Sequence, residues 1–182
     1  MRIIAGSAKG KIIKCRDGFD TRPTTDRVKE SLFSMIAPYI SEAVVLDLFS
    51  GTGNIALEAI SRGAKRAVMI EKEKEALRVI IQNVNNLGFD DRCRAYKNET
   101  LRALTILGKK REKFNIIFLD PPYKDNVCNE VIEKISETGI LAEGGLIVAE
   151  HHILEDMEDV ISEFKKVDER RYGKKELSFY TR

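Results

Sequence analysis

The stretch VVLDLFSGTGNIALEAI, residues 44–60, decides the fold. Its β-branched and apolar start predicts a buried strand over residues 44–48, and the periodicity that follows predicts a helix over residues 54–61. Gly51 and Gly53 lie in the turn between them, where they allow the backbone to approach a ligand closely. A strand, a glycine turn and a helix in this order are typical of open α/β sheets, which bind ligands beyond the carboxyl ends of their strands.

The rest of the chain continues this alternation. Further strands are expected at residues 67–71, 94–96, 116–119 and 146–149, with helices at 74–87, 100–107 and 127–138. Such alternation predicts a parallel, doubly wound α/β sheet covered on both faces. Residues 165–171 and 176–180 flank Gly173 and predict an antiparallel hairpin at the C-terminus. The expected fold is therefore a Rossmann-like, mostly parallel seven-stranded sheet that ends in an antiparallel hairpin.

The first forty residues form a different kind of segment. Residues 3–5 and 11–15 predict a small β-hairpin, and a helix is expected within RPTTDRVKESLFSMI, residues 22–36, because Pro23 excludes an earlier start and Pro38 ends it. We expect a single domain over residues 1–182, in which residues 1–40 are an extension of the core at residues 41–182.

Composition excludes several classes of protein. No apolar run approaches the roughly 20 residues that span a bilayer, and the start MRIIAGSAKGK lacks the apolar core of a signal peptide. Cys15, Cys93 and Cys128 are isolated and, together with His151 and His152, make no zinc spacing. These features predict a metal-free cytoplasmic protein with reduced thiols, and we expect both histidines at the surface.

The net charge of +2 is small, but its distribution is uneven. A carboxylate-free run of five basic residues opens the chain: Arg2, Lys9, Lys11, Lys14 and Arg16. Such a run either binds phosphate backbones, by releasing condensed counterions, or is a solvated hairpin, and charge alone does not separate the two. A second basic cluster is a candidate for the same face: Arg170, Arg171, Lys174 and Lys175.

A second motif, DPPY at residues 120–123, follows the apolar strand at 116–119. The amine on a nucleobase is a poor nucleophile because its lone pair is delocalised into the ring. The Asp120 carboxylate and the Pro121 carbonyl can each accept one N–H and so direct the lone pair at a methyl donor. Pro121 and Pro122 stiffen the loop, and Tyr123 can stack on the base. No metal or covalent intermediate is required.

The glycine turn at Gly51 and Gly53 and the ends of the next two strands are suited to the methyl donor S-adenosylmethionine (SAM). Free N–H groups at the start of the helix can bind its carboxylate, and Glu71, at the end of the second strand, can accept hydrogen bonds from both ribose hydroxyls. Asn98 and Glu99 follow the third strand, near the expected adenine amino group. The predicted cofactor-binding residues in these segments are Asp47, Phe49, Gly51, Gly53, Glu71, Asn98 and Glu99.

The same turn also satisfies a dinucleotide fingerprint, since GTGNIA matches GxGxxA. A match of that kind is weak alone, and a hydride-transfer enzyme has no evident use for DPPY. The two motifs in this order therefore favour a SAM-dependent methyltransferase.

Over its whole length the chain resembles the bacterial 16S ribosomal RNA guanine-N2 methyltransferases of the RsmD type. The resemblance rests on MRIIAGSAKGK, RPTTDRVKESLF, LDLFSGTGNIALEAISRGA, LDPPY and the closing YG before a strand. It implies methyl transfer from SAM to the N2 amine of guanine 966, in free 16S ribosomal RNA or in a small-subunit particle, by a monomer. It also implies that Arg22, Pro23 and Thr24 border the cofactor. The family often has Asp after the third strand, where this chain has Asn98 and Glu99.

Three alternatives remain. A DNA amino-methyltransferase acting on adenine N6 or cytosine N4 would use the same chemistry, but only the first forty or so residues are left for target recognition. A protein-glutamine methyltransferase usually carries Asn at the position of Asp120. A non-catalytic RNA-binding module would not need Asp47, Gly51, Gly53 and Asp120, and SAM affinity would distinguish it.

Overall fold

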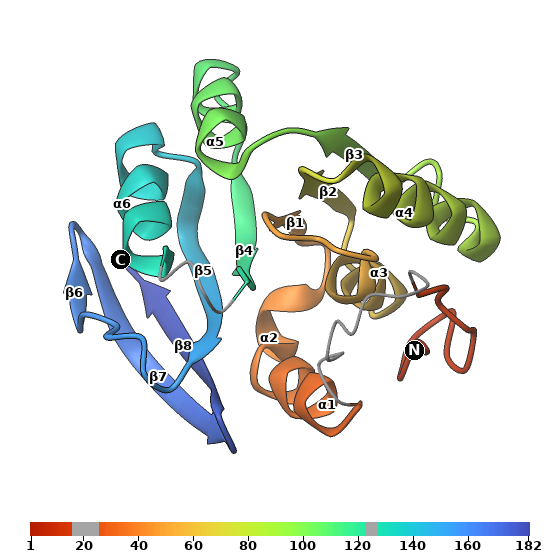
Figure 1. The fold of residues 1–182 in the computed structure, drawn as a ribbon, viewed down its shortest axis with the longest axis horizontal. Helices are drawn as coiled ribbons and strands as arrows, with labels where there is room; N and C mark the ends of the chain where they lie inside the picture. The colour runs from red at the N-terminus through yellow and green to blue at the C-terminus, as the bar shows by residue number, and fades with distance from the viewer. Residues whose placement is uncertain (16–25, 123–126) are drawn as a thin grey trace.

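The structure is a computed structural model that describes residues 1–15, 26–122 and 127–182. One eight-stranded sheet, with strand order β3-β2-β1-β4-β5-β8-β7-β6, crosses the part of the chain that is described (Figure 1). The strands are β1 (Val44–Asp47), β2 (Arg66–Glu71), β3 (Cys93–Lys97), β4 (Phe114–Leu119), β5 (Leu141–His152), β6 (Val160–Ile161), β7 (Phe164–Tyr172) and β8 (Lys175–Thr181). The helices are α1 (Asp26–Met35), α2 (Ala37–Ile40), α3 (Asn54–Ser61), α4 (Lys74–Leu87), α5 (Thr100–Lys109) and α6 (Cys128–Thr138).

Strands β1 to β5 are parallel, and the order of the chain reverses between β1 and β4. Strand β1 pairs with β2 on one side and with β4 on the other, so the loops after β1 and β4 leave in opposite directions. A crevice forms at such a switch point, at the carboxyl ends of the strands. The motifs at Asp47 and Asp120 follow these two strands and therefore meet at this crevice.

Alternate residues along the strands enter two separate cores, one on each face of the sheet. Val45 and Met69 pack with the core that includes residues of α1, α3 and α4, whereas Leu46 and Ile70 pack with the core that includes residues of α5 and α6. Because strand side chains alternate between faces, apolar residues at successive positions are required when helices cover both faces. This arrangement confirms the predicted doubly wound fold.

Beyond the N-terminal residues, the structure differs from the predicted elements at three places that bear on the sheet and its approach. A two-residue strand, β6, adds an eighth strand to the predicted seven because it pairs antiparallel with the start of β7. Strand β5 spans Leu141–His152 rather than residues 146–149, since its second half pairs with β8. A short helix, α2, includes Pro38 in its first turn, where a missing N–H costs no hydrogen bond.

The N-terminal residues form an antiparallel turn instead of the predicted two-stranded hairpin. Arg2 and Ile12 make an isolated bridge, and Ile3 and Lys11 share a backbone hydrogen bond, but residues 1–15 contain no regular strand. Some of its backbone groups bond to α3 instead, as the Ser7 N–H does when it donates to the Ser61 carbonyl at 2.8 Å. Gly6, with φ of +84°, lies so close that a Cβ would meet the Ser61 carbonyl oxygen at 1.8 Å. The segment is therefore part of the packed domain.

A buried carboxylate on α3, Glu58, holds this segment in place. Its oxygens accept the backbone N–H groups of Ile4 and Ala5 at 2.8 and 3.0 Å. Glu58 also pairs with Arg62 at 2.8 Å and with Lys29 of α1 at 3.0 Å, and the Lys29 and Glu58 side chains are 1% and 0% exposed. A buried charge is tolerated only when it is paired and hydrogen-bonded. This network joins the N-terminal segment, α1 and α3.

Candidate active site

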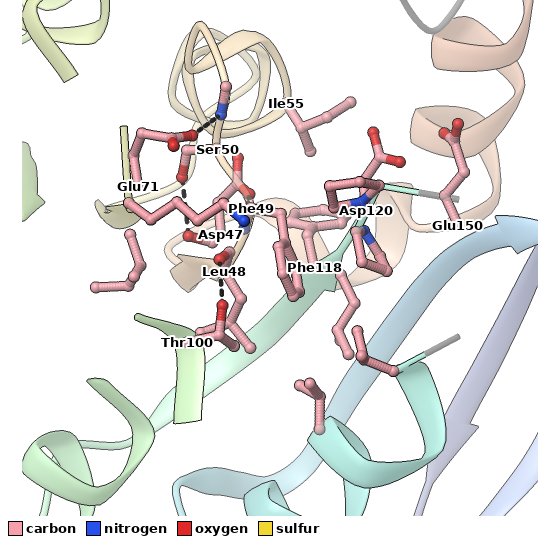
Figure 2. Close-up of a pocket in the computed structure, with 18 of the residues that line it drawn as sticks. Asp47, Leu48, Phe49, Ser50, Ile55, Glu71, Thr100, Phe118, Asp120 and Glu150 are labelled. Carbon is pink, nitrogen blue, oxygen red and sulfur yellow. Dashed lines mark hydrogen bonds between the residues drawn. The ribbon is translucent and has the colours of Figure 1, made fainter. Parts of the chain in front are cut away.

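A cavity of about 1080 Å³ opens at the switch point. Its lining comes from the ends of β1, β2, β4 and β5, from the residues after β3, and from the start of β8. Figure 2 shows Asp47 and Glu71 at one end of this cavity and Asp120 and Glu150 at the other. The two predicted motifs therefore face one space, which is large enough for a nucleotide-sized ligand and a second group.

Glu71 ties the glycine turn to the end of β2. Its Oε2 accepts the Gly51 N–H at 2.9 Å (Figure 2). Its Oε1 accepts the Glu73 N–H at 2.8 Å. Each carboxylate oxygen has two lone-pair directions, so both oxygens keep capacity for ribose hydroxyls. Glu71 thus shapes the loop in addition to its predicted role in binding the cofactor.

The two glycines of the turn have different surroundings. A Cβ at Gly51 would have no atom within 4 Å, and the Gly51 backbone lines the cavity. Gly53 has φ of +81°, and its Cβ would lie 3.2 Å from the side chains of Leu57 and Met69. Both positions have a positive φ that favours glycine, +55° at Gly51 and +81° at Gly53. Gly53 is also enclosed by core side chains, whereas the Gly51 backbone is open to a ligand.

Asp47 lies at the end of β1, 4% exposed, and lines the cavity. Burial raises the pKa of its carboxyl to about 7, and the nearby Glu71 charge adds to the rise, although the Phe49 N–H donates to Asp47 Oδ1 at 3.4 Å. Such a site favours the neutral acid unless a cation enters. The Ser50 hydroxyl donates to the Asp47 carbonyl and holds the turn (Figure 2).

Phe49, Asn98 and Glu99 also line the cavity, and their role in binding the cofactor stays a prediction. The Asn98 side-chain oxygen accepts the Glu99 N–H at 3.0 Å, which leaves the Asn98 amide group as a donor. Thr100, which sequence reasoning missed, donates to the Leu48 carbonyl at 3.2 Å and so connects the end of β1 to the start of α5. No sequence signal distinguishes Thr100 from an ordinary residue in the first turn of a helix.

The opposite end of the cavity holds Asp120, Pro121 and Pro122. Burial raises the pKa of the Asp120 carboxyl well above its usual range, and the Glu150 charge raises it further, whereas Lys175 acts against the rise. Tyr123 lies outside the described residues, as do the predicted Arg16, Arg22, Pro23 and Thr24. The roles assigned to these residues stay predictions.

Sequence reasoning also missed Glu150 and predicted Lys175 only as part of a basic surface cluster, whereas both residues line the same end of the cavity. Both follow ordinary strand patterns, so only the pairing of β5 with β8 reveals them. The neighbouring His151 corrects another prediction. It is 1% exposed, not at the surface, and its Nε2 lies 2.9 Å from the Ser178 hydroxyl, because β5 continues between β4 and β8. His152 is half-buried.

Neither a metal-binding cluster nor a membrane-spanning helix is found among the described residues. Within residues 1–15, 26–122 and 127–182, no three His, Cys, Asp or Glu residues are grouped so that they could hold a metal ion. No helix in the described part of the chain has the length and apolar character needed to cross a membrane.

The fold matches that of a solved structure over the whole chain. The structure described as "Putative methyltransferase yhhF from Escherichia coli" matches with a TM-score of 0.89 and 33% identity, covering 100% of this chain and 97% of that one. This fold, with a glycine turn and an Asp-Pro-Pro loop at one cavity, defines a SAM-dependent methyltransferase. The family described as "Conserved hypothetical protein 95" matches residues 1–181, and the chain belongs to that family.

Two relatives match over nearly the whole chain. "Putative rRNA methyltransferase YlbH" of Bacillus subtilis is 37% identical over 180 residues, which are 99% of this chain and 98% of that protein. "Ribosomal RNA small subunit methyltransferase D" of Escherichia coli K12 is 33% identical over 182 residues, covering 100% of this chain and 90% of that protein. The resemblance seen in the sequence is confirmed at the level of the family.

Proposed function

We propose that this protein transfers a methyl group from SAM to the exocyclic N2 amine of a guanine in 16S ribosomal RNA. The observation that carries the proposal is the single cavity, which joins the glycine turn at Gly51 to the carboxyl group of Asp120. The named relatives act on ribosomal RNA, and one acts on the small subunit. A cytoplasmic location follows from this substrate.

The cavity fits SAM on three observations. The Gly51 backbone faces open space, Asp47 is a buried carboxyl that a cation would stabilise in its charged form, and Glu71 has lone pairs left for hydroxyls. Asn98 and Glu99 lie where they can contact a base. When bound, SAM supplies a methyl group on a positively charged sulfur.

Asp120 and Pro121 act on the amine. The carboxylate accepts one N–H and the Pro121 carbonyl accepts the other, so that the nitrogen lone pair points along the cavity toward Asp47. The raised pKa of Asp120 suits its Oδ atoms to receive the proton that the methylated nitrogen releases. Tyr123 is expected to stack on the base from the segment that follows Pro122.

RNA binding is assigned to the N-terminal extension. Arg2, Lys9, Lys11 and Lys14 are all exposed, while Glu58 fixes the backbone from which they project. A rigid segment that presents several cations loses little entropy when it binds phosphates. We assign residues 1–40 to substrate binding and residues 41–182 to catalysis.

A second basic surface supports this assignment. A smaller concavity of about 420 Å³ between α1 and the β7–β8 turn is lined by Arg27, Arg171, Tyr172 and Lys175, among others. Lys175 lines both this concavity and the main cavity. A nucleic-acid strand that passes over the concavity would therefore deliver its base to Asp120.

The direct test maps N2-methylated guanines in 16S ribosomal RNA from cells with and without the gene. We expect one guanine to lose its methyl group in the deletion strain and to regain it with the wild-type protein, but not with Asp120→Ala. The exposed variant Lys109→Ala, at the end of α5, is the matched control and should restore methylation. The same set of N2-methylated guanines in 16S ribosomal RNA from both strains would refute the proposal.

A further inference from the structure

Three charged side chains form a row at the reacting end of the cavity. Asp120 follows β4, Glu150 lies on β5 and Lys175 begins β8, and these are neighbouring strands in the order β4-β5-β8. The register pairs Leu119 with Ala149, so Asp120 and Glu150 are adjacent across the parallel pair. Figure 2 shows both carboxyl groups at the same end of the cavity.

The Glu150 and Lys175 side chains are joined by an ion pair, in which Lys175 Nζ contacts Glu150 Oε1. They are only 6% and 17% exposed, respectively. Replacing a buried ion pair by apolar residues is often neutral or stabilising, so the fold by itself gives little reason to place one here. Both residues line the cavity, which means that a group entering it meets their polar atoms.

The edge of guanine presents a matching row of groups. Its N2 amine and the neighbouring N1–H are donors, and O6 beyond them is an acceptor. Asp120 and Glu150 supply acceptors, and Lys175 supplies a donor, in the same order across the three strands.

We propose that Glu150 and Lys175 select guanine as the target base, Glu150 by accepting the N1–H and Lys175 by donating to O6, while Asp120 holds the N2 amine. This inference rests on the proposed function and assigns the base specificity of the same site. Glu150 and Lys175 are specificity-determining residues, distinct from the residues that bind SAM.

The arrangement discriminates against the other nucleobase amines. The ring nitrogen beside adenine N6 or cytosine N4 is an acceptor, without a hydrogen. If either amine lay at Asp120, that lone pair would face the Glu150 carboxylate. Adenine would also offer Lys175 a C–H group in place of O6, whereas cytosine keeps a carbonyl, O2, at that position and is rejected through its ring nitrogen. A site built to bond a donor rejects an analogue that lacks it, because its polar groups are then left unpaired. The pair thereby excludes the substrates of a DNA amino-methyltransferase.

The test compares two bases at the target position of a small-subunit RNA substrate under single-turnover conditions. One substrate carries guanine, and the other carries 2-aminopurine, which keeps the N2 amine but has no N1–H and no O6. We expect the wild-type protein to prefer guanine by at least about 100-fold in kcat/KM, because 2-aminopurine makes neither contact and leaves the polar groups of the site unpaired. Glu150→Gln should lower the guanine rate about 10- to 100-fold and shrink the preference, because an amide can also donate to the unprotonated N1 of 2-aminopurine.

Lys175→Met tests the second contact, the hydrogen bond from Lys175 to guanine O6. This variant also provides a test of the inference if Glu150→Gln folds poorly. Because Lys175 also acts on Asp120, both bases should react more slowly, but guanine should lose about tenfold or more beyond the loss for 2-aminopurine, which has no O6. Glu176→Gln is the matched control, since Glu176 is next to Lys175 on β8 and its side chain points to the other face of the strand. SAM affinity, measured by calorimetry, should be the same in all variants.

Two results would overturn the inference while the proposed function stands: a wild-type enzyme that methylates both bases equally, or variants that slow both bases by one common factor. If the ion pair only stabilised the fold, its loss would slow methylation of guanine and of 2-aminopurine by the same factor. If the wild-type protein methylates no guanine in small-subunit RNA, the proposed function itself fails.

Discussion

Asp47 offers a quantitative prediction for cofactor binding. Its carboxyl is 4% exposed and has a pKa of about 7, because burial penalises the charged form. SAM carries a positive sulfur and an ammonium group, so binding should favour the ionised carboxylate. The free protein must then release a proton to bind, and SAM affinity should increase as the pH rises toward and through 7.

The magnitude follows from the ionised fraction. For a pKa of about 7 that falls well below 5.5 in the complex, raising the pH from 5.5 to 7.5 should tighten SAM binding about 25-fold. The range ends below the pKa of the cofactor's own α-amino group, about 8. Isothermal titration calorimetry at four pH values measures the effect, and Asp47→Asn should bind weakly with little dependence on pH.

The pH dependence of the free energy of unfolding tests the pKa of Asp47 independently. The folded pKa lies above the unfolded value of 3.8, so the folded protein retains the proton and stability falls as the pH rises from about 4 to 7. The shift of about three units corresponds to at most about 4 kcal/mol of unfolding free energy. Asp47→Asn should remove this slope in urea titrations of the free protein. Two results together would refute the reasoning. The SAM affinity of the wild-type protein would change less than twofold between pH 5.5 and 7.5, and the stability of the wild-type protein and of Asp47→Asn would depend on pH in the same way.

Three further substitutions probe the rest of the site. Asp120→Ala should abolish methyl transfer while SAM affinity stays within a few fold, because the carboxylate contacts the amine and not the cofactor. Loss of tight SAM binding would contradict that role. Asp120→Asn should retain only a trace of the rate. Glu71→Ala should weaken SAM binding about 10- to 100-fold in calorimetry, since it removes the ribose acceptor and frees the Gly51 turn. Replacing Lys9, Lys11 and Lys14 together by Ala should weaken RNA binding and reduce its salt slope by about 0.9 for each duplex phosphate that the variant no longer neutralises. An unchanged slope in filter-binding assays would mean that recognition lies elsewhere.

The sequence by itself determined the parallel part of the sheet. Local patterns specify it: apolar runs at residues 44–48, 67–71 and 116–119 alternate with helical periodicity, and helix α4 begins and ends at the predicted residues, Lys74 and Leu87. The glycine turn and the Asp-Pro-Pro loop follow two of these strands directly. Because parallel strands end at one edge, their meeting at a common cavity also follows from the sequence.

Tertiary structure decided which distant residues join that cavity and how the N-terminal residues are held. Hydrophobic alternation predicts that residues 146–149 form a strand, but it cannot predict that β5 continues to His152 between β4 and β8. This extension of β5 buries His151 and places Glu150 and Lys175 beside Asp120. Residues 1–15 lack regular strands because their backbone groups bond to Glu58 and Ser61 of α3. Successive side chains of a strand alternate between the two faces of the sheet, so the sequence specifies the face that each residue occupies. The choice of neighbouring strand depends instead on contacts between residues far apart in the chain.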